Sequence, residues 1–218
     1  MDVDRIQQRV TEYVGQAPRF HALRVLDRDE WRRDVGEDSA LFGGTAAIFT
    51  DDGEILVREG YEGDALHELV HAAGVHKNHG QSDFIMEGLA QAAAEDLGQK
   101  LGLTVRKTYK EETAFVRKYL VPATGLSLKE LVRGYASASD KSGFLADLIM
   151  ARYGHLFTVE DWGQNAVEGL RRELHTQVGG YNPYLIYLID EKRGGKRRHA
   201  RPANQRNVVA EVNAMLRR

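Results

Sequence analysis

The sequence predicts an α+β fold, with a small mixed sheet near the N-terminus and a mostly helical remainder. Strand-like runs occur only before residue 60, and two of them flank a turn signal. From residue 64 onward, apolar residues recur at helical spacing between capping residues and glycines. Strands followed by a long series of helices are typical of α+β proteins, so we expect one domain of this class.

Two helices and one strand are expected before residue 45. Apolar residues at three-and-four spacing over 3–14 predict a short amphipathic helix. The run 21–26 alternates in polarity as a strand does. Asp27, with Glu30 three residues later, forms a capping-box pattern that predicts a helix ending near Gly36.

A hairpin is predicted where the runs 45–50 and 54–59 flank Asp51-Asp52-Gly53. After it, capping boxes at Thr108 and Ser127 predict helix starts, and Pro122 predicts a helix end. In chain order, the expected helices span 64–74, 82–98 or 82–102, 108–121, 127 onward, 140–154, 158–179, 182 onward and 204–216.

Composition narrows the chemistry that the chain can carry. Its 218 residues are 42% hydrophobic and 28% charged, as is ordinary for a globular protein, with a formal net charge of -2. This near-neutral balance indicates no partner selected by overall charge. Because the chain has no cysteine, it has no disulfide framework, thiolate metal site or cysteine nucleophile. Any metal must be held by histidine, aspartate or glutamate.

The sequence contains no apolar run long enough to cross a bilayer and no apolar segment typical of a secretory signal. We therefore expect a cytoplasmic protein without a membrane partner, and an unconventional export route stays open. The domain organisation expected is one domain over 1–191. A basic loop and C-terminal helix over 192–218 would pack on the same domain, with Gly194-Gly195 as a joint.

Histidines cluster between residues 67 and 79, where His67-Glu68-Leu69-Val70-His71 forms an HExxH pattern on an expected helix. Residues four apart lie on the same helix face, so the two imidazoles can share one zinc ion at about 2.0–2.1 Å. Glu68 lies beside that face, where it can take a proton from an attacking water. The competing interpretation is a surface helix with two solvated histidines. An apolar stripe on the same helix is formed by Leu66, Leu69, Val70 and Ala73.

A catalytic zinc site usually has a third protein ligand, for which the sequence offers three candidates. Glu87 lies early on the next expected helix, and the small residue Gly88 after it would let two helices approach closely. His79 and His76 lie in the loop between the helices. The metzincin pattern HExxHxxGxxH is not met, because Lys77 occupies the place of its last histidine.

The HExxH motif followed by Glu87-Gly88-Leu89-Ala90 resembles the gluzincin branch of the zincin metallopeptidases, over roughly residues 45–98. The resemblance implies that His67, His71 and Glu87 bind Zn²⁺ and that Glu68 is the general base. It also implies that the hairpin binds an extended peptide by strand addition.

Two departures from gluzincins are visible. Gln91 occupies the place where many gluzincins have an aspartate that supports a ligand histidine. The GxMEN-type element of aminopeptidases is missing from the strands, so an endopeptidase acting on peptide or protein substrates is expected.

Gluzincins also use a tyrosine or histidine from the helical half to stabilise the oxyanion of the tetrahedral intermediate. By resemblance, the candidates here are Tyr109, Tyr135, Tyr153 and His155, and Tyr109 is our choice.

The segment Lys192–Arg206 holds seven basic residues and no acidic one. A solvated loop is the favoured interpretation, because no aromatic residue is present for base stacking. A nucleic-acid contact is the alternative, and it would suit a regulatory protease of the ImmA/IrrE kind or an SprT-like protease. His79-Gly80 faintly resembles the third-ligand site of SprT-like proteases. A non-catalytic helical binding domain is the alternative from another class.

Overall fold

The computed structural model describes residues 2–35, 46–76, 83–153 and 172, and within them the chain is an α+β protein, as predicted. In chain order the elements are α1 (Val3–Val14), β1 (Ala22–Leu26), α2 (Arg28–Val35), β2 (Ala47–Phe49), β3 (Glu54–Arg58), the 3-10 turn η2 (Glu62–Asp64), α3 (Ala65–Ala72), α4 (Asp83–Leu101), α5 (Lys110–Phe115), the π-helical turn η3 (Val116–Leu120), α6 (Val121–Thr124), α7 (Leu128–Ser137) and α8 (Lys141–Tyr153).

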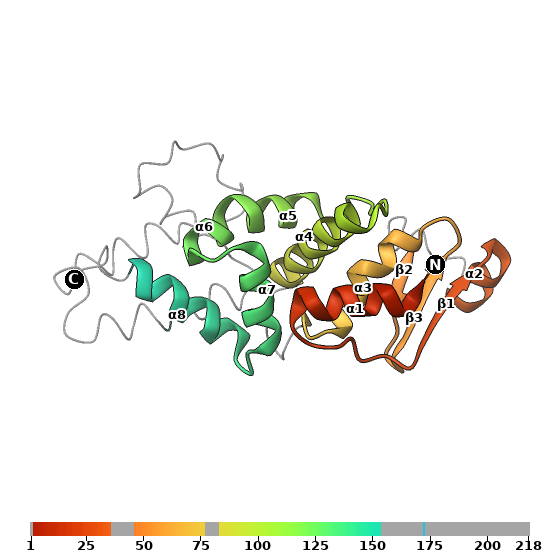
Figure 1. Cartoon of the computed structure of the whole chain (residues 1–218), viewed down its shortest axis with the longest axis horizontal. Helices are drawn as coiled ribbons and strands as arrows, with labels where there is room; N and C mark the ends of the chain where they lie inside the picture. Colours follow the sequence, from red (N-terminus) through yellow and green to blue (C-terminus); the bar gives the residue numbers. More distant parts are fainter. Residues whose placement is uncertain (1, 36–45, 77–82, 154–171, 173–218) are drawn as a thin grey trace, which may run out of the picture.

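The molecule is elongated, and its sheet lies at one end. Figure 1 shows the three strands and α2 at that end, α6 and α8 at the other, and α3 and α4 between them. The helix that carries the HExxH motif, α3, is therefore central, in contact with the sheet, with α1 and with α4.

The sheet has the order β1-β3-β2 and is mixed, because β1 pairs with β3 in parallel and β2 pairs with β3 antiparallel. The predicted hairpin is confirmed as β2 and β3. Side chains of a strand alternate between faces, so Ile55 and Val57 enter the main core while Leu56 packs with Leu26 and Trp31 on the other face. One face of β3 thus supports α3, and the other is covered by α2.

Helix α1 forms as its apolar spacing predicts. Its Ile6, Val10 and Val14 are buried, and Asp2 caps its start by accepting a hydrogen bond from the Arg5 backbone N–H at 3.1 Å. Gly15 ends the helix with a φ of +85°, a conformation that residues with a Cβ rarely adopt. Because α1 contacts α3, α4 and α7, it joins the sheet end to the helical end.

The stripe predicted on α3 is buried, with Leu66, Leu69 and Val70 fully inaccessible to solvent. Helix α4, which contacts α3, buries several small residues, among them the fully buried Ala90 and Ala93. Small side chains let the two backbones approach closely, so the ligand candidates carried by each helix can meet.

Two sequence predictions fail between α4 and α6. Thr108 does not cap α5: the N-cap is Tyr109, without a side-chain cap bond, because the Thr108 hydroxyl donates to Gln91 at 3.0 Å instead. Pro122 does not end the helical stretch. It lies in the first turn of α6, where its missing N–H costs little, after the π-helical turn has broken the α-helical register.

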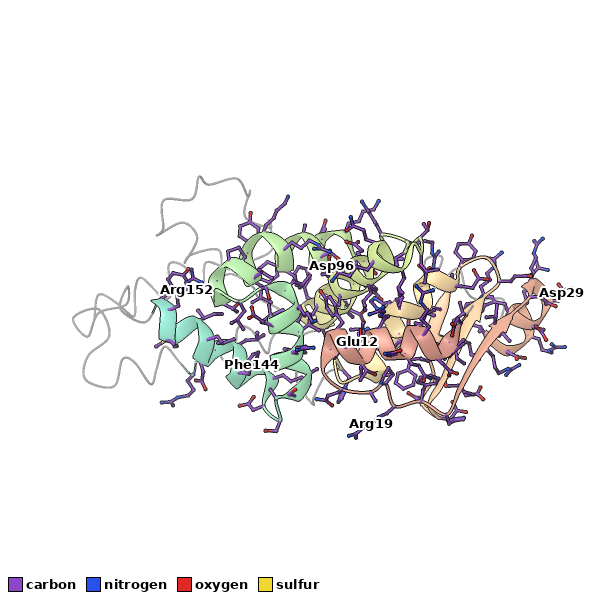
Figure 2. The ribbon with its side chains drawn as sticks, viewed as in Figure 1. Glu12, Arg19, Asp29, Asp96, Phe144 and Arg152 are labelled. Carbon is purple, nitrogen blue, oxygen red and sulfur yellow. The ribbon has the colours of Figure 1, made fainter. Side chains whose placement is uncertain are left out.

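Helix α7 begins, and α8 begins and ends, close to where the sequence predicts. Ser127 and Glu130 form the predicted capping box at the start of α7, and α8 covers the expected range. Asp96, labelled in Figure 2, links this part to α1: it accepts hydrogen bonds from the Tyr13 hydroxyl at 3.0 Å and from Arg117 at 2.8 Å.

The expected helices over 158–179, from 182 onward and over 204–216 lie outside the described residues, as do His155 and the basic segment 192–206 with its glycine joint. In the part of the chain that the structure describes, no helix combines the length and the apolar character that crossing a membrane requires.

Candidate metal centre

Helix α3 presents His67 and His71 one turn apart, with their rings directed at each other. The two Nε2 atoms are 2.9 Å apart, and the ring planes meet edge to face at 77°. Both residues are buried, at 7% and 9% exposed. The apolar stripe on the same helix fixes its rotation, so the histidine side is held toward α4.

Helix α4 brings Glu87 to this pair. Its Oε2 lies 3.0 Å from His67 Nε2 and 3.4 Å from His71 Nε2. Among the described histidine, aspartate and glutamate residues, these three form the group whose ligand atoms all lie within 4.8 Å of one another. His76 is exposed and outside this group, and His79 lies outside the described residues.

The spacing of the three atoms suits a small cation. Ligand atoms at about 2.0–2.1 Å from a tetrahedral zinc ion are about 3.3 Å apart, close to the separations seen here. The protonation of His71 is consistent with a metal ligand. Its Nδ1 lies 2.5 Å from the Val75 carbonyl oxygen, which only accepts hydrogen bonds, so Nδ1 carries the proton. With Nδ1 carrying the proton of the neutral ring, Nε2 is the nitrogen of His71 that could offer a lone pair to a metal ion. Two nitrogens and one carboxylate oxygen form a donor set that zinc accepts.

The pKa values of Glu87 and His71 are shifted by the charges and hydrogen bonds within the cluster. Burial opposes the charge on Glu87, but hydrogen bonds from His67 and His71 outweigh it and hold the pKa of this carboxyl well below its usual range. Burial likewise opposes a charge on His71, yet its hydrogen bond to Glu87 and the charges of Glu68 and Glu87 raise its pKa. The carboxylate is therefore ionised at neutral pH, as a metal ligand must be.

Glu68 lies beside the cluster and is not a member of it. Its side chain is half-buried. Burial raises the pKa of the Glu68 carboxyl, and the nearby charges of Glu87 and Asp64 act in the same direction, while His67 and His71 oppose them. A carboxyl in this environment holds a proton more tightly than a solvated glutamate does.

Of the three oxyanion candidates among the described residues, the structure brings Tyr109 to the cluster, and His155 lies outside those residues. Its ring stacks on His67, with 5.2 Å between centroids and 11° between planes. Burial raises the pKa of its hydroxyl, helped by the charge of Glu87 and by a hydrogen bond to Glu87. Tyr135 and Tyr153 are instead buried in the helical core.

Gln91 does not serve a histidine, as its place in the sequence suggested it could. Its amide N–H donates to the Arg106 carbonyl at 2.6 Å, and its oxygen accepts from Thr108. His67 Nδ1 is buried and has no hydrogen-bond partner among the described residues. The aspartate-to-histidine contact expected in many gluzincins is thus missing here.

Sequence analysis did not identify Asp64 and Gln91 as polar residues that bind the segment after α4. Asp64 accepts from the backbone N–H of Arg106 at 2.9 Å and from its guanidinium Nε. Their spacing could have identified them. Asp64 lies three residues before His67, and Gln91 lies four residues after Glu87, so each shares a helix face with a ligand candidate.

Comparison with known proteins adds no identity to this geometry. The chain matches none of the protein-family models, curated proteins or solved structures with which it was compared.

Proposed function

We propose that the chain is a zinc-dependent metallopeptidase of gluzincin type that acts as an endopeptidase. The observation that carries the proposal is the convergence of His67 Nε2, His71 Nε2 and Glu87 Oε2 from two helices, within 4.8 Å of one another. An HExxH helix by itself supplies two ligands. The third, from α4, completes the donor set of a catalytic rather than a closed structural zinc site.

The residues divide the chemistry among them. His67, His71 and Glu87 would hold the ion, which when bound lowers the pKa of a coordinated water and polarises the scissile carbonyl. The Glu68 carboxylate takes a proton from the attacking water and passes it to the leaving amine nitrogen. The Tyr109 hydroxyl donates a hydrogen bond to the oxyanion that develops on the substrate carbonyl.

The sheet supports a peptide as substrate. Strand β2 lies at an edge of the described sheet and contacts α3, the helix that carries His67 and His71. An extended peptide can add to such an edge through main-chain hydrogen bonds. This arrangement suits an endopeptidase, because strand addition needs no free terminus of the substrate.

Metal analysis tests the proposal directly. Purified wild type should contain zinc, while His71→Ala and Glu87→Ala should lose it. His21→Ala and Glu111→Ala, which change exposed residues outside the cluster, are the matched controls and should keep it. A Glu87→Ala protein that binds zinc as tightly as wild type contradicts the assigned ligand set.

Activity is tested with Glu68→Gln. This variant should keep zinc and lose hydrolysis of an unfolded protein such as reduced casein, because the amide cannot accept the water proton. If zinc is bound and neither wild type nor Glu68→Gln cleaves any peptide library, the chain is a zinc-binding domain without peptidase activity.

A further inference from the structure

The segment 102–109, which we call the strap, joins α4 to α5 and ends at Tyr109. Residues 103–109 belong to no helix or strand, and among the described residues backbone hydrogen bonds fasten only the two ends of the strap: the Leu103 N–H donates to the Gly98 carbonyl, and the Tyr109 carbonyl accepts from the Thr113 N–H, both at 2.9 Å. Tyr109 begins α5 with φ −97° and ψ 65° and with no side-chain cap bond. Its position over His67 therefore depends on contacts between the strap and the rest of the protein as well as on the packing of α5 against α4.

One residue of the strap, Arg106, is held through its backbone from both ligand-bearing helices. The Arg106 N–H donates to Asp64 at the start of α3, and the Arg106 carbonyl accepts from Gln91 on α4. Asp64 and Gln91 are 7% and 1% exposed, so both anchors are shielded from competing water. Buried hydrogen bonds of this kind are costly to break, because a buried polar group left without a partner has no water to replace it.

The anchors and the ligands share rigid elements. Asp64 is one turn from His67, and Gln91 is one turn from Glu87 on the same side of α4. Each ligand-bearing helix thus fixes the strap at a set distance from its own metal ligand. Gln91 also accepts from Thr108, the residue directly before Tyr109.

Two glycines let neighbouring elements pack closely against the strap. A Cβ at Gly63 would lie 2.0 Å from the Thr104 carbonyl oxygen, and one at Gly98 would lie 2.6 Å from Val105 Cγ2. Glycine at both positions lets η2 and α4 approach the strap more closely than any other residue allows.

We propose that Asp64 and Gln91 are positioning residues that hold Tyr109 over the metal ligands through the Arg106 backbone and Thr108. This inference rests on the proposed function only for its catalytic consequence. The placement of the tyrosine ring is a property of the metal-free chain. Gln91 then has a different role from the aspartate of gluzincins: it serves the oxyanion donor and leaves the histidine without support.

The first test is NMR of the full-length, metal-free protein. The Tyr109 ring stacked on His67 shifts the resonances of the His67 ring protons, and Tyr109→Leu reports the size of that shift. Gln91→Met, which keeps the side-chain length and removes both hydrogen bonds, should reproduce most of the change. Thr108→Val tests the same link without altering the core, and Gln99→Met on the exposed end of α4 is the control. Folded Gln91→Met and Thr108→Val proteins with unshifted His67 signals would overturn the proposal.

The second test is a double-mutant cycle on the zinc-loaded protein. Tyr109→Phe should lower kcat about 100-fold, and Gln91→Met on the order of tenfold, with zinc content unchanged. The double variant should be no slower than Tyr109→Phe, because the position of the ring no longer affects the rate once the hydroxyl is absent. Additive losses would show that Gln91 acts on something other than Tyr109. Wild type without zinc or activity refutes the proposed function, and the NMR result stands apart from it.

Discussion

Replacing Gly88 by alanine tests how closely α5 must pack on α4 beside the metal cluster. A Cβ at residue 88 would lie 2.6 Å from the Glu112 carbonyl oxygen and 2.9 Å from Val116 Cγ2. The first distance is about 0.8 Å inside the 3.4 Å at which ordinary contact begins. Because the nearest atom belongs to the backbone, α5 itself has to move.

The size of the effect follows from that overlap. Overpacking in a well-packed core destabilises by about 1–3 kcal/mol, so the midpoint of urea unfolding should fall accordingly. Tyr109 directly precedes α5 and would move with it. A displacement on the order of 1 Å near reacting atoms lowers a rate by about 100-fold, while zinc content should stay as in wild type.

The assay compares this variant with Gly134→Ala on α7. There, a Cβ would meet the ring of Phe144, labelled in Figure 2, at 2.2 Å. Both variants should lose stability, but at a temperature where both are folded only Gly88→Ala should lose peptide hydrolysis. A Gly88→Ala protein with wild-type stability and activity refutes the close packing argued here.

Three further predictions concern acidity, the tyrosine and a cap. Zinc affinity should fall as the pH is lowered, and at a less acid pH than for an ordinary histidine site, because the raised pKa of His71 lets protons compete earlier. Titration with a competing chelator at several pH values measures this, and a constant affinity from pH 8 to pH 5 would contradict it. Tyr109→Phe should lower kcat with little change in KM, and an equal rise in KM would indicate a binding role instead. Ser127→Ala should destabilise the fold by about 1 kcal/mol in urea unfolding, through the lost capping box of α7, with zinc content unaffected. Unchanged stability would mean that the box contributes nothing.

The parts of the fold that could be predicted depend on neighbours in the chain. The spacing of Ile6, Val10 and Val14 specifies α1, and Ser127 with Glu130 specifies the start of α7, because the interacting groups lie within a turn of each other. The HExxH pair belongs to the same class, since four residues along one helix already place both imidazoles on one side.

One failed prediction involves a partner far away in sequence, and the other involves a local change of helix type. Thr108 has the pattern of a cap, but its hydroxyl donates to Gln91 on another helix. The π-helical turn that lets Pro122 continue the helical stretch has no signal at the proline itself. For local patterns of this kind, a distant hydrogen bond outweighs a cap worth about 1 kcal/mol.

The candidate site combines both kinds of information. Glu87 could be singled out from the sequence by its place on the next helix, but only the packing of α4 on α3 distinguishes it from the loop residue His76. The choice of Tyr109 among four residues came from resemblance, whereas its place over His67 depends on the strap and its anchors. Sequence spacing indicated which residues could bind metal or stabilise an oxyanion. It could not indicate which side chains would form hydrogen bonds with the strap.

The two histidines of the cluster are anchored unequally, and this has a consequence for metal exchange. His71 is tethered at its far nitrogen by the Val75 carbonyl, whereas the far nitrogen of His67 has no such tether among the described residues. Losing an outer tether typically weakens a metal site by 10–100-fold. If zinc is bound here as proposed, its dissociation should therefore begin with rotation of the His67 ring, and Tyr109, which is stacked on that ring, should slow the rotation.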